Sequence, residues 1–163
     1  MAIWVCRTGS KGEFEQLFWD NSCICLTREN FDFDLKNKED EEIINHIKAI
    51  NPSAALQTIS NTWSQVNIFA NRMNVGDVVI IPKKNTAKIS VGTIGSEYIF
   101  NSKEKFPLKH MRSIKFIKKD IDTHTFPQKL RYSMRAFRTI FSINCEEEML
   151  EELKKKGVVF DEI

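Results

Sequence analysis

Few side chains in this sequence have the types and spacing that a catalytic site needs. The chain contains no phosphate-binding loop, no Gly-x-Ser-x-Gly element and no His-Glu-x-x-His pair. Its three histidines, His46, His110 and His124, are scattered, and no carboxylate accompanies them at a metal-ligand spacing. We therefore predict no catalytic residue, no metal ligand and no cofactor. Enzymatic activity stays open, but the sequence favours a binding module.

The cysteines indicate where the protein resides. No apolar run approaches the ~20 residues of a membrane helix, and the first residues lack the apolar stretch of a signal peptide. We expect a cytoplasmic protein without membrane contact, whose Cys6, Cys23, Cys25 and Cys145 are reduced thiols. Cys23 and Cys25 alternate with apolar neighbours, so we interpret them as buried hydrophobic residues.

Basic residues are concentrated in one part of the chain. Residues 82–144 carry fourteen Lys or Arg and four Asp or Glu, a net charge of +10, whereas 1–81 and 145–163 each carry −4. Clustered cations attract polyanions such as nucleic acids. A solvated face balanced by the acidic segments explains the same pattern equally well. If nucleic acid binds, the predicted phosphate contacts are Lys83, Lys84, Arg131, Arg135 and Arg138.

Aromatic residues offer a second kind of binding chemistry. Trp63 and Phe69 lie on a predicted helix ahead of a Gly-Asp turn, and Trp4 and Tyr98 lie in or beside predicted strands. Aromatic rings that face a polar cavity can stack on a base, which is worth ~1–3 kcal/mol per base. For each ring the alternative is a place in the hydrophobic core.

Hydrophobic periodicity predicts the elements that position these residues. The predicted strands are 3–8, 22–27, 78–81, 88–94, 98–100, 109–117 and 138–143. The predicted helices are 11–20 (or a turn), 37–50 with Asn37 as N-cap, 60–73 with Ser60 as N-cap, and 145–156; segment 31–35 is a strand or loop, and 130–137 is ambiguous. Because the strands follow one another after residue 75, no βαβ repeat is expected. The fold class is α+β, and a small twisted β-barrel with flanking helices would remove exposed sheet edges.

We assign one domain to residues 1–144. Residues 145–163 form a charged C-terminal helix or the start of a linker.

Several motifs in a fixed order resemble a known family. They are IWVCRTG at 3–9, GEFE at 12–15, WSQVNIFANRMNVGDVVI at 63–80, VGTIGSEY at 91–98 and LRYSMRAFRTI at 130–140. The helix that opens with Trp and leads into Met-x-x-Gly-Asp and an apolar strand resembles the EVE branch of the PUA-like superfamily. The whole set is most similar to the N-terminal reader domains of Mrr-type restriction endonucleases.

This resemblance implies a small twisted barrel that recognises a modified base flipped out of duplex DNA into an aromatic pocket. Trp63 and Phe69 would form the pocket wall, Tyr98 would approach from the barrel, and Thr27 or Asn67 would read a base edge. The chain would then serve a restriction or defence system, with room for a nuclease domain or subunit as a partner. The chain has Val66 where the EVE pattern usually has Arg, and it lacks the paired acids and Lys of the Mrr-type nuclease.

Other functions remain open on the sequence. The same basic segment would serve an RNA-binding PUA-like module. A small-molecule hydrolase of the same barrel class would use a Lys and an acid in its pocket, and a protein-interaction domain would use neither. Phosphate contacts would give steep salt dependence, and a need for the 2′-hydroxyl would distinguish RNA from DNA.

Overall fold

The structure, a computed structural model, describes residues 1–136 and 138–160. Within these residues the strands are β1 (Ile3–Cys6), β2 (Cys23–Cys25), β3 (Val78–Pro82), β4 (Lys88–Ile94), β5 (Ile99–Phe100), β6 (His110–Asp122) and β7 (Ile140–Ser142). The helices are α1 (Glu15–Asn21), α2 (Asp40–Ile50), α3 (Leu56–Asn67), the π-helical turn η1 (Ile68–Arg72), α4 (Gln128–Ser133) and α5 (Glu146–Lys155).

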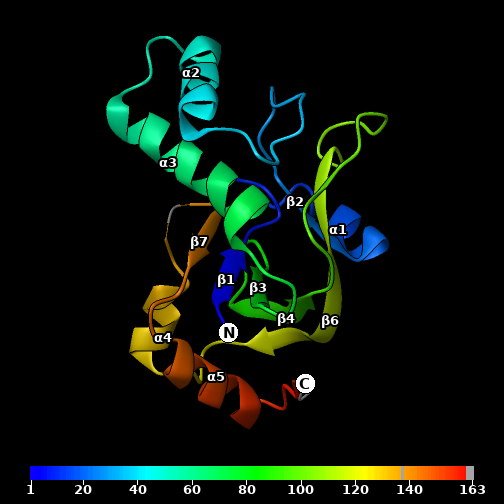
Figure 1. Cartoon of the computed structure of the whole chain (residues 1–163). Helices are drawn as coiled ribbons and strands as arrows, with labels where there is room; N and C mark the ends of the chain where they lie inside the picture. The colour runs from blue at the N-terminus through cyan, green and yellow to red at the C-terminus, as the bar shows by residue number, and fades with distance from the viewer. Residues whose placement is uncertain (137, 161–163) are drawn as a thin grey trace.

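The strands form one sheet in the order β2-β6-β4-β3-β1-β7, and β5 pairs with β6 outside this path. β1 runs parallel to β3 and antiparallel to β7, and the other pairings are antiparallel. The sheet curls strongly, like half of a barrel, with helices around it (Figure 1). The α+β class and the flanking helices are thereby confirmed. The parallel β1–β3 pair was not predicted.

Side chains of the central strands are buried on both faces of the sheet. On β1, Trp4 and Cys6 belong to a core cluster shared with β2, α2, α3 and η1. Ile3 and Val5 point to the opposite face and belong to a second cluster with α4 and α5. A strand covered on both sides consists of apolar residues without alternation, which is why β1 and β3 are continuous apolar runs.

β6 is the longest strand, and its pairing with β4 is irregular. The register shifts on both sides of Val91. A Cβ atom at Gly92 would lie 2.7 Å from the carbonyl oxygen of Lys115, so only glycine permits this close approach of the two strands. Bulges of this kind bend a strand and increase its twist, consistent with the curl of the sheet.

Two predicted helix starts are wrong. α2 begins at Asp40, and Asn37 lies before it with a positive φ of 63° instead of capping it. α3 begins at Leu56, four residues before Ser60, which therefore lies inside the helix. The predicted helix to Met73 ends in η1, where the chain widens from α- to π-helical bonding. Neither α2 nor α3 has a side-chain cap, so cap residues could not mark these boundaries.

The segment after β6 was ambiguous in sequence. Its first part is α4, while Phe137 lies outside the described residues. α5 buries Met149 and Leu153 in the same cluster as Ile3 and Val5, so the charged C-terminal helix packs on the sheet. Residues 161–163 of the predicted C-terminal segment also lie outside the described part.

Candidate functional site

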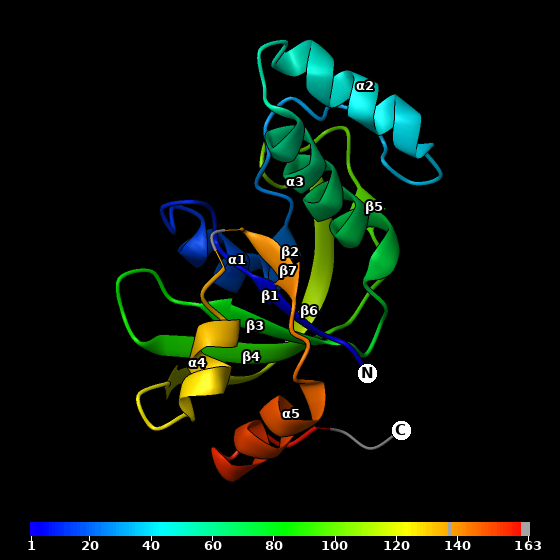
Figure 2. The ribbon, with the colours of Figure 1, turned by 90° about the vertical axis from the view of Figure 1, so that its left-hand side faces the viewer.

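A pocket of about 480 Å³ opens where four segments meet. These segments are the loop that follows β1, the β3–β4 hairpin, the turn after β6, and α4 with the residues just after it. Figure 2 shows the hairpin, α4 and the loop after β1 on the same side of the molecule, at its left. The lining residues are Arg7, Thr8, Gly9, Ser10, Gly12, Pro82, Lys83, Lys84, Asn85, Thr86, Ala87, Lys88, Ile89, Thr123, His124, Arg131, Met134 and Arg135. We call this site the basic pocket.

Six lysine and arginine side chains line the basic pocket, and no Asp or Glu is among the lining residues. Four of them, Lys83, Lys84, Arg131 and Arg135, are residues that the sequence singled out as phosphate contacts. The fifth such residue, Arg138, lies apart from them and lines a second pocket. The other two cations of the basic pocket, Arg7 and Lys88, were not singled out in the sequence.

Arg7 enters the pocket directly from the end of β1. Its backbone N–H donates to the carbonyl oxygen of Thr139 at 2.8 Å, which extends the pairing with the β7 segment. Its Nη2 atom donates to the carbonyl oxygen of Ala136 at 2.8 Å. These two bonds fix both the backbone and the side chain of Arg7, because each carbonyl belongs to the segment between α4 and β7.

The loop after Arg7 depends on glycine. Gly9 and Gly12 have φ angles of 103° and 70°, values that residues with a side chain rarely adopt. A Cβ atom at Gly12 would lie 2.6 Å from Cβ of Lys84. The loop can therefore approach the β3–β4 hairpin closely, and Nζ of Lys84 donates to the carbonyl oxygen of Ser10 at 3.3 Å.

Few acidic groups compensate these cations. Nζ of Lys83 lies 3.9 Å from a carboxylate oxygen of Asp120 in β6. Within residues 1–136 and 138–160, the Nε atoms of Arg7 and Arg131 are buried without a hydrogen-bond acceptor. Burial lowers the pKa of Arg7 from its ordinary value, because the charged form loses hydration. Convergent, under-compensated guanidinium and ammonium groups are the donors that bind phosphate oxygens.

The residues predicted for base stacking lie elsewhere. Neither this pocket nor the second one is lined by any of them. Trp4 and Phe69 are buried in the core, and the Trp4 indole N–H donates to a carboxylate oxygen of Asp77 at 2.9 Å. Asp77 also accepts bonds from the backbone N–H groups of Asn74 and Ala2, so the Gly-Asp motif fastens β1 to the turn before β3.

The remaining base-pocket candidates are partly exposed. Trp63 packs against the first core cluster, and its Nε1 atom is buried without an acceptor among the described residues. Asn67 accepts a bond from Asn71 at 3.1 Å, and Thr27 lies in the loop after β2. Tyr98 meets Phe69 edge-on, with ring centroids 6.2 Å apart. The structure thus brings Phe69 and Tyr98 together as a packed pair.

Tyr98 also belongs to a buried polar network. Its hydroxyl accepts from the backbone N–H of Leu35 and lies 2.6 Å from Nδ1 of His110. The opposite ring nitrogen, Nε2, contacts the carbonyl oxygen of Phe31. Because a carbonyl only accepts, Nε2 carries the proton and Nδ1 accepts from Tyr98. Burial lowers the pKa of His110 and raises that of Tyr98 to about 12, which favours this neutral pair.

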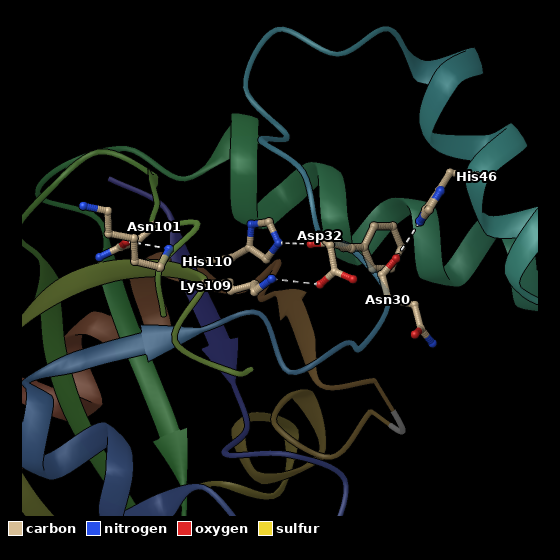
Figure 3. A network of polar contacts seen from close by, with 8 residues as sticks. Asn30, Asp32, His46, Asn101, Lys109 and His110 are labelled. Atoms are coloured by element: carbon tan, nitrogen blue, oxygen red, sulfur yellow. Dashed lines mark hydrogen bonds and ion pairs between the residues drawn. The ribbon is translucent and has the colours of Figure 1, made fainter. Parts of the chain in front are cut away.

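This network holds the loop between β2 and α2. Figure 3 shows His110 bonded to that loop, Lys109 reaching Asp32 at 3.2 Å, and His46 of α2 contacting the carbonyl oxygen of Asn30 at 2.6 Å. His46 and His110 therefore act here as structural residues.

The cysteines and the remaining titratable groups show no metal arrangement. Cys6, Cys23 and Cys25 are buried in the first core cluster, with the two Sγ atoms of Cys23 and Cys25 3.7 Å apart. No group of three or more His, Cys, Asp or Glu side chains in the described part of the chain is arranged to hold a metal ion. No helix in that part is long and apolar enough to cross a bilayer.

Fold and pocket together define a small α+β protein with a curled sheet and a basic pocket at its rim. The chain belongs to a family described as a domain of unknown function (DUF8426), whose sequence model matches residues 4–144. The match spans the sheet apart from Ile3, the first residue of β1, and it includes every residue that lines the basic pocket. A search of curated proteins found no match.

The sequence contained one usable signal for the residues that were missed. Arg-Thr-Gly-Ser-Lys-Gly directly follows the first strand, and such a glycine-containing loop at a strand end is a common place for ligand contacts. The net charge of −4 over residues 1–81 concealed this signal, because the sequence analysis looked for cations where they are concentrated.

Proposed function

We propose that this chain is a nucleic-acid-binding module that holds phosphate groups in the basic pocket. The observation that carries the proposal is the convergence of six cationic side chains from separate parts of the chain, with no carboxylate in the lining. Bringing like charges together without acidic partners costs free energy, and an anionic ligand offsets that cost.

The form of the pocket fits a nucleotide-sized group. Its volume of about 480 Å³ falls within the range of ligand sites, roughly 300–1,000 Å³. Arg7 and Arg131 each present a buried Nε–H that lacks an acceptor in the described chain, and a phosphate oxygen would supply one. Pro82, Ile89 and Met134 add an apolar part to the wall.

The finer form of the proposal is a PUA-like, EVE-like reader of a modified base in duplex DNA. A curled sheet with flanking helices is compatible with such a small barrel. The basic pocket would hold the backbone, and a separate aromatic surface that includes Trp63 would read the base, since phosphate contacts position a duplex and base contacts specify the sequence. A role in restriction or defence, with a nuclease as partner, belongs to the same proposal.

Two of the competing functions make different demands on the site. A hydrolase that uses a Lys and an acid needs a carboxylate beside the lysines, and the basic pocket has none among its lining residues. An RNA-binding module needs donors and acceptors that recognise the 2′-hydroxyl. Comparing its affinity for RNA with its affinity for DNA therefore distinguishes it from a DNA reader.

The test is equilibrium binding of fluorescent duplex DNA carrying methylated, hydroxymethylated or unmodified bases, with duplex RNA in parallel, over a salt series. The variant Lys84→Gln/Arg131→Gln removes two pocket cations. The matched control, Lys103→Gln/Lys105→Gln, removes the same charge from an exposed loop outside both pockets.

We expect the pocket variant to weaken DNA binding by tenfold or more and to reduce the salt slope by about two, at ~0.9 per phosphate contact. The control should bind like the unaltered chain. Equal binding by the pocket variant and its control, or no binding of any nucleic acid by the unaltered chain, would refute the proposal. A preference for RNA over DNA would move the function to the RNA-binding alternative.

A further inference from the structure

A second pocket, of about 400 Å³, lies on the other side of the segment that links α4 to β7. Its lining residues are Ser64, Ile68, Arg72, Ser133, Ala136, Arg138, Phe141, Ser142 and Asn144. Residues of α4 and of the segment after it line both pockets: Arg131, Met134 and Arg135 line the basic pocket, while Ser133 and Ala136 line the second one. We call this second site the serine–arginine pocket.

We propose that the serine–arginine pocket binds a further phosphate of the same nucleic-acid strand that enters the basic pocket. The inference rests on the proposed function. It adds Arg72 to the binding surface and gives Arg138 a place separate from the other predicted phosphate contacts.

The charges in the serine–arginine pocket favour an oxyanion. Arg72 and Arg138 are exposed, form no ion pair with any described residue, and have no carboxylate among the other lining residues. Arg72 is held against the indole ring of Trp4, with its guanidinium carbon 5.6 Å from the ring centroid. Such a cation–π contact orders the guanidinium before a ligand arrives and leaves its edge free to donate.

The polar side chains of the pocket supply further donors. Ser64, Ser142 and Asn144 make no side-chain hydrogen bond within the described part of the chain. Hydroxyl and amide groups of this kind, beside arginine, are the usual companions of a bound phosphate. The pocket thus combines two cations with three free neutral donors.

The nearby end of η1 does not oppose an anion. A helix C-terminus carries partial negative charge from its free carbonyl groups. Here Arg112 of β6 donates from Nε to the carbonyl oxygen of Phe69 at 2.7 Å and from Nη2 to that of Ala70 at 3.3 Å. The buried cation therefore satisfies two carbonyl groups of η1 and reduces the negative partial charge at this end of the helix.

The two pockets are also mechanically connected. Arg7 lines the basic pocket, and its Nη2 atom donates to the carbonyl oxygen of Ala136, which lines the serine–arginine pocket. Thr139 of the same segment donates its hydroxyl proton to Gln65 of α3. The segment between α4 and β7 is thus held by Arg7 on one side and by Gln65 of α3 on the other.

The experiment compares a long ligand with a short one. Arg72→Gln/Arg138→Gln is measured against the control Lys103→Gln/Lys105→Gln, using the duplex DNA panel and adenosine monophosphate, whose single phosphate can occupy only one pocket at a time. Arg72→Lys is included because it keeps the positive charge. The melting temperature of each variant shows whether loss of the contact with Trp4 disturbs the fold.

We expect Arg72→Gln/Arg138→Gln to weaken duplex binding by about tenfold and to lower the salt slope by about two, with unchanged affinity for the mononucleotide. Duplex binding and a salt slope equal to the control, in a folded variant, would overturn this inference. The proposed function would survive that result if Lys84→Gln/Arg131→Gln still lost binding. Loss of mononucleotide and duplex binding together, in a folded variant, would also overturn it, because the two pockets would then act as one site.

Discussion

The guanidinium of Arg7 donates a 2.8 Å hydrogen bond from Nη2 to the carbonyl oxygen of Ala136, 129 residues further along the chain. The bond joins the end of the first strand to the segment between α4 and β7, near the rim of the basic pocket. Nη2 of Arg7 thus stabilises the fold, and the other guanidinium nitrogen atoms remain for a ligand. The fork of a guanidinium permits both roles at once, whereas an ammonium group is a single point of charge.

Arg7→Lys should therefore weaken nucleic-acid binding by about tenfold while keeping the net charge. The lost hydrogen bond should lower the free energy of unfolding by about 1–2 kcal/mol. Arg28→Lys is the matched control, because Arg28 is also half-buried with a buried Nε that lacks an acceptor among the described residues, and it lines neither pocket. Binding isotherms and denaturant unfolding measure both effects. Equal affinity for Arg7→Lys and Arg28→Lys would remove Arg7 from the site.

The close approach of Gly12 to the β3–β4 hairpin gives a second prediction. Gly12→Ala should lower the free energy of unfolding by about 1–2 kcal/mol, because a residue with a side chain is unfavourable in the left-handed conformation. It should also displace Lys84, whose Cβ would lie 2.6 Å from the new Cβ atom. Gly76→Ala is the control, because Gly76 has a φ of 91° and open space around its Cβ position. Both variants should melt earlier.

Only Gly12→Ala should also weaken binding, since it alone moves a pocket lysine. Thermal unfolding and DNA binding on the same samples separate strain from loss of the site. If Gly12→Ala binds as tightly as Gly76→Ala, the loop after β1 does not shape the pocket.

The charge distribution in the sequence was a better guide to the residues that lie together than the aromatic pattern was. Lys83 and Lys84 follow the predicted strand 78–81, Arg131 lies in α4 and Arg135 follows α4, so the concentration of charge in residues 82–144 was enough to select residues that converge. The parallel pairing of β1 with β3 brings Arg7 beside them. Such a pairing between distant segments leaves no local trace in the sequence.

Helical spacing was a weaker guide for the aromatic residues. Trp63 and Phe69 both fit an apolar face, but spacing alone cannot tell which ring meets the core. η1 rotates the chain after Asn67, and Phe69 becomes fully buried while Trp63 remains partly exposed. Tertiary packing, not periodicity, decided between them. The start of α3 at Leu56 could not be predicted from capping residues either, because no side chain caps this helix.

Stability should depend on pH through His110. Burial lowers the pKa of this histidine below its unfolded value of about 6.5, so the folded state favours the neutral ring. Above about pH 6.5 the ring is neutral in both states and its contribution is fully present. As the pH falls below that value, the unfolded chain binds a proton first, and the free energy of unfolding decreases until the folded pKa is passed.

The free energy of unfolding should change by at most about 1.4 kcal/mol per pH unit, which corresponds to the uptake of one proton on unfolding. Denaturant unfolding between about pH 5 and 7 measures it. His110→Gln should flatten this dependence on pH, whatever its effect on the absolute free energy of unfolding. An unchanged slope in His110→Gln would assign the titration to another group.

Trp63 provides the test of base recognition. Its ring packs against the first core cluster, yet its Nε1–H is buried with no acceptor in the described chain. A buried unpaired donor costs about 1–3 kcal/mol, and a ligand oxygen or nitrogen would offset that cost. Trp63→Phe keeps an aromatic ring and removes the N–H, so we expect it to fold and to lose part of the preference for modified over unmodified DNA. Salt-dependent binding to unmodified DNA should persist, because the proposed phosphate contacts lie in the two pockets, and Trp63 lines neither of them.

Trp63→Ala should lose the same preference more completely. Trp19→Phe is the control, since Trp19 of α1 packs against Phe116 of β6, with the ring planes tilted by 41°, and lines neither pocket. The core interpretation makes a different prediction. Removing a buried tryptophan costs ~3–5 kcal/mol, so Trp63→Ala would then melt early and lose all binding together. Thermal unfolding and binding to modified and unmodified duplexes should be measured on the same samples. A folded Trp63→Phe with unchanged discrimination removes the indole N–H from base recognition, and a folded Trp63→Ala with unchanged discrimination removes the whole side chain.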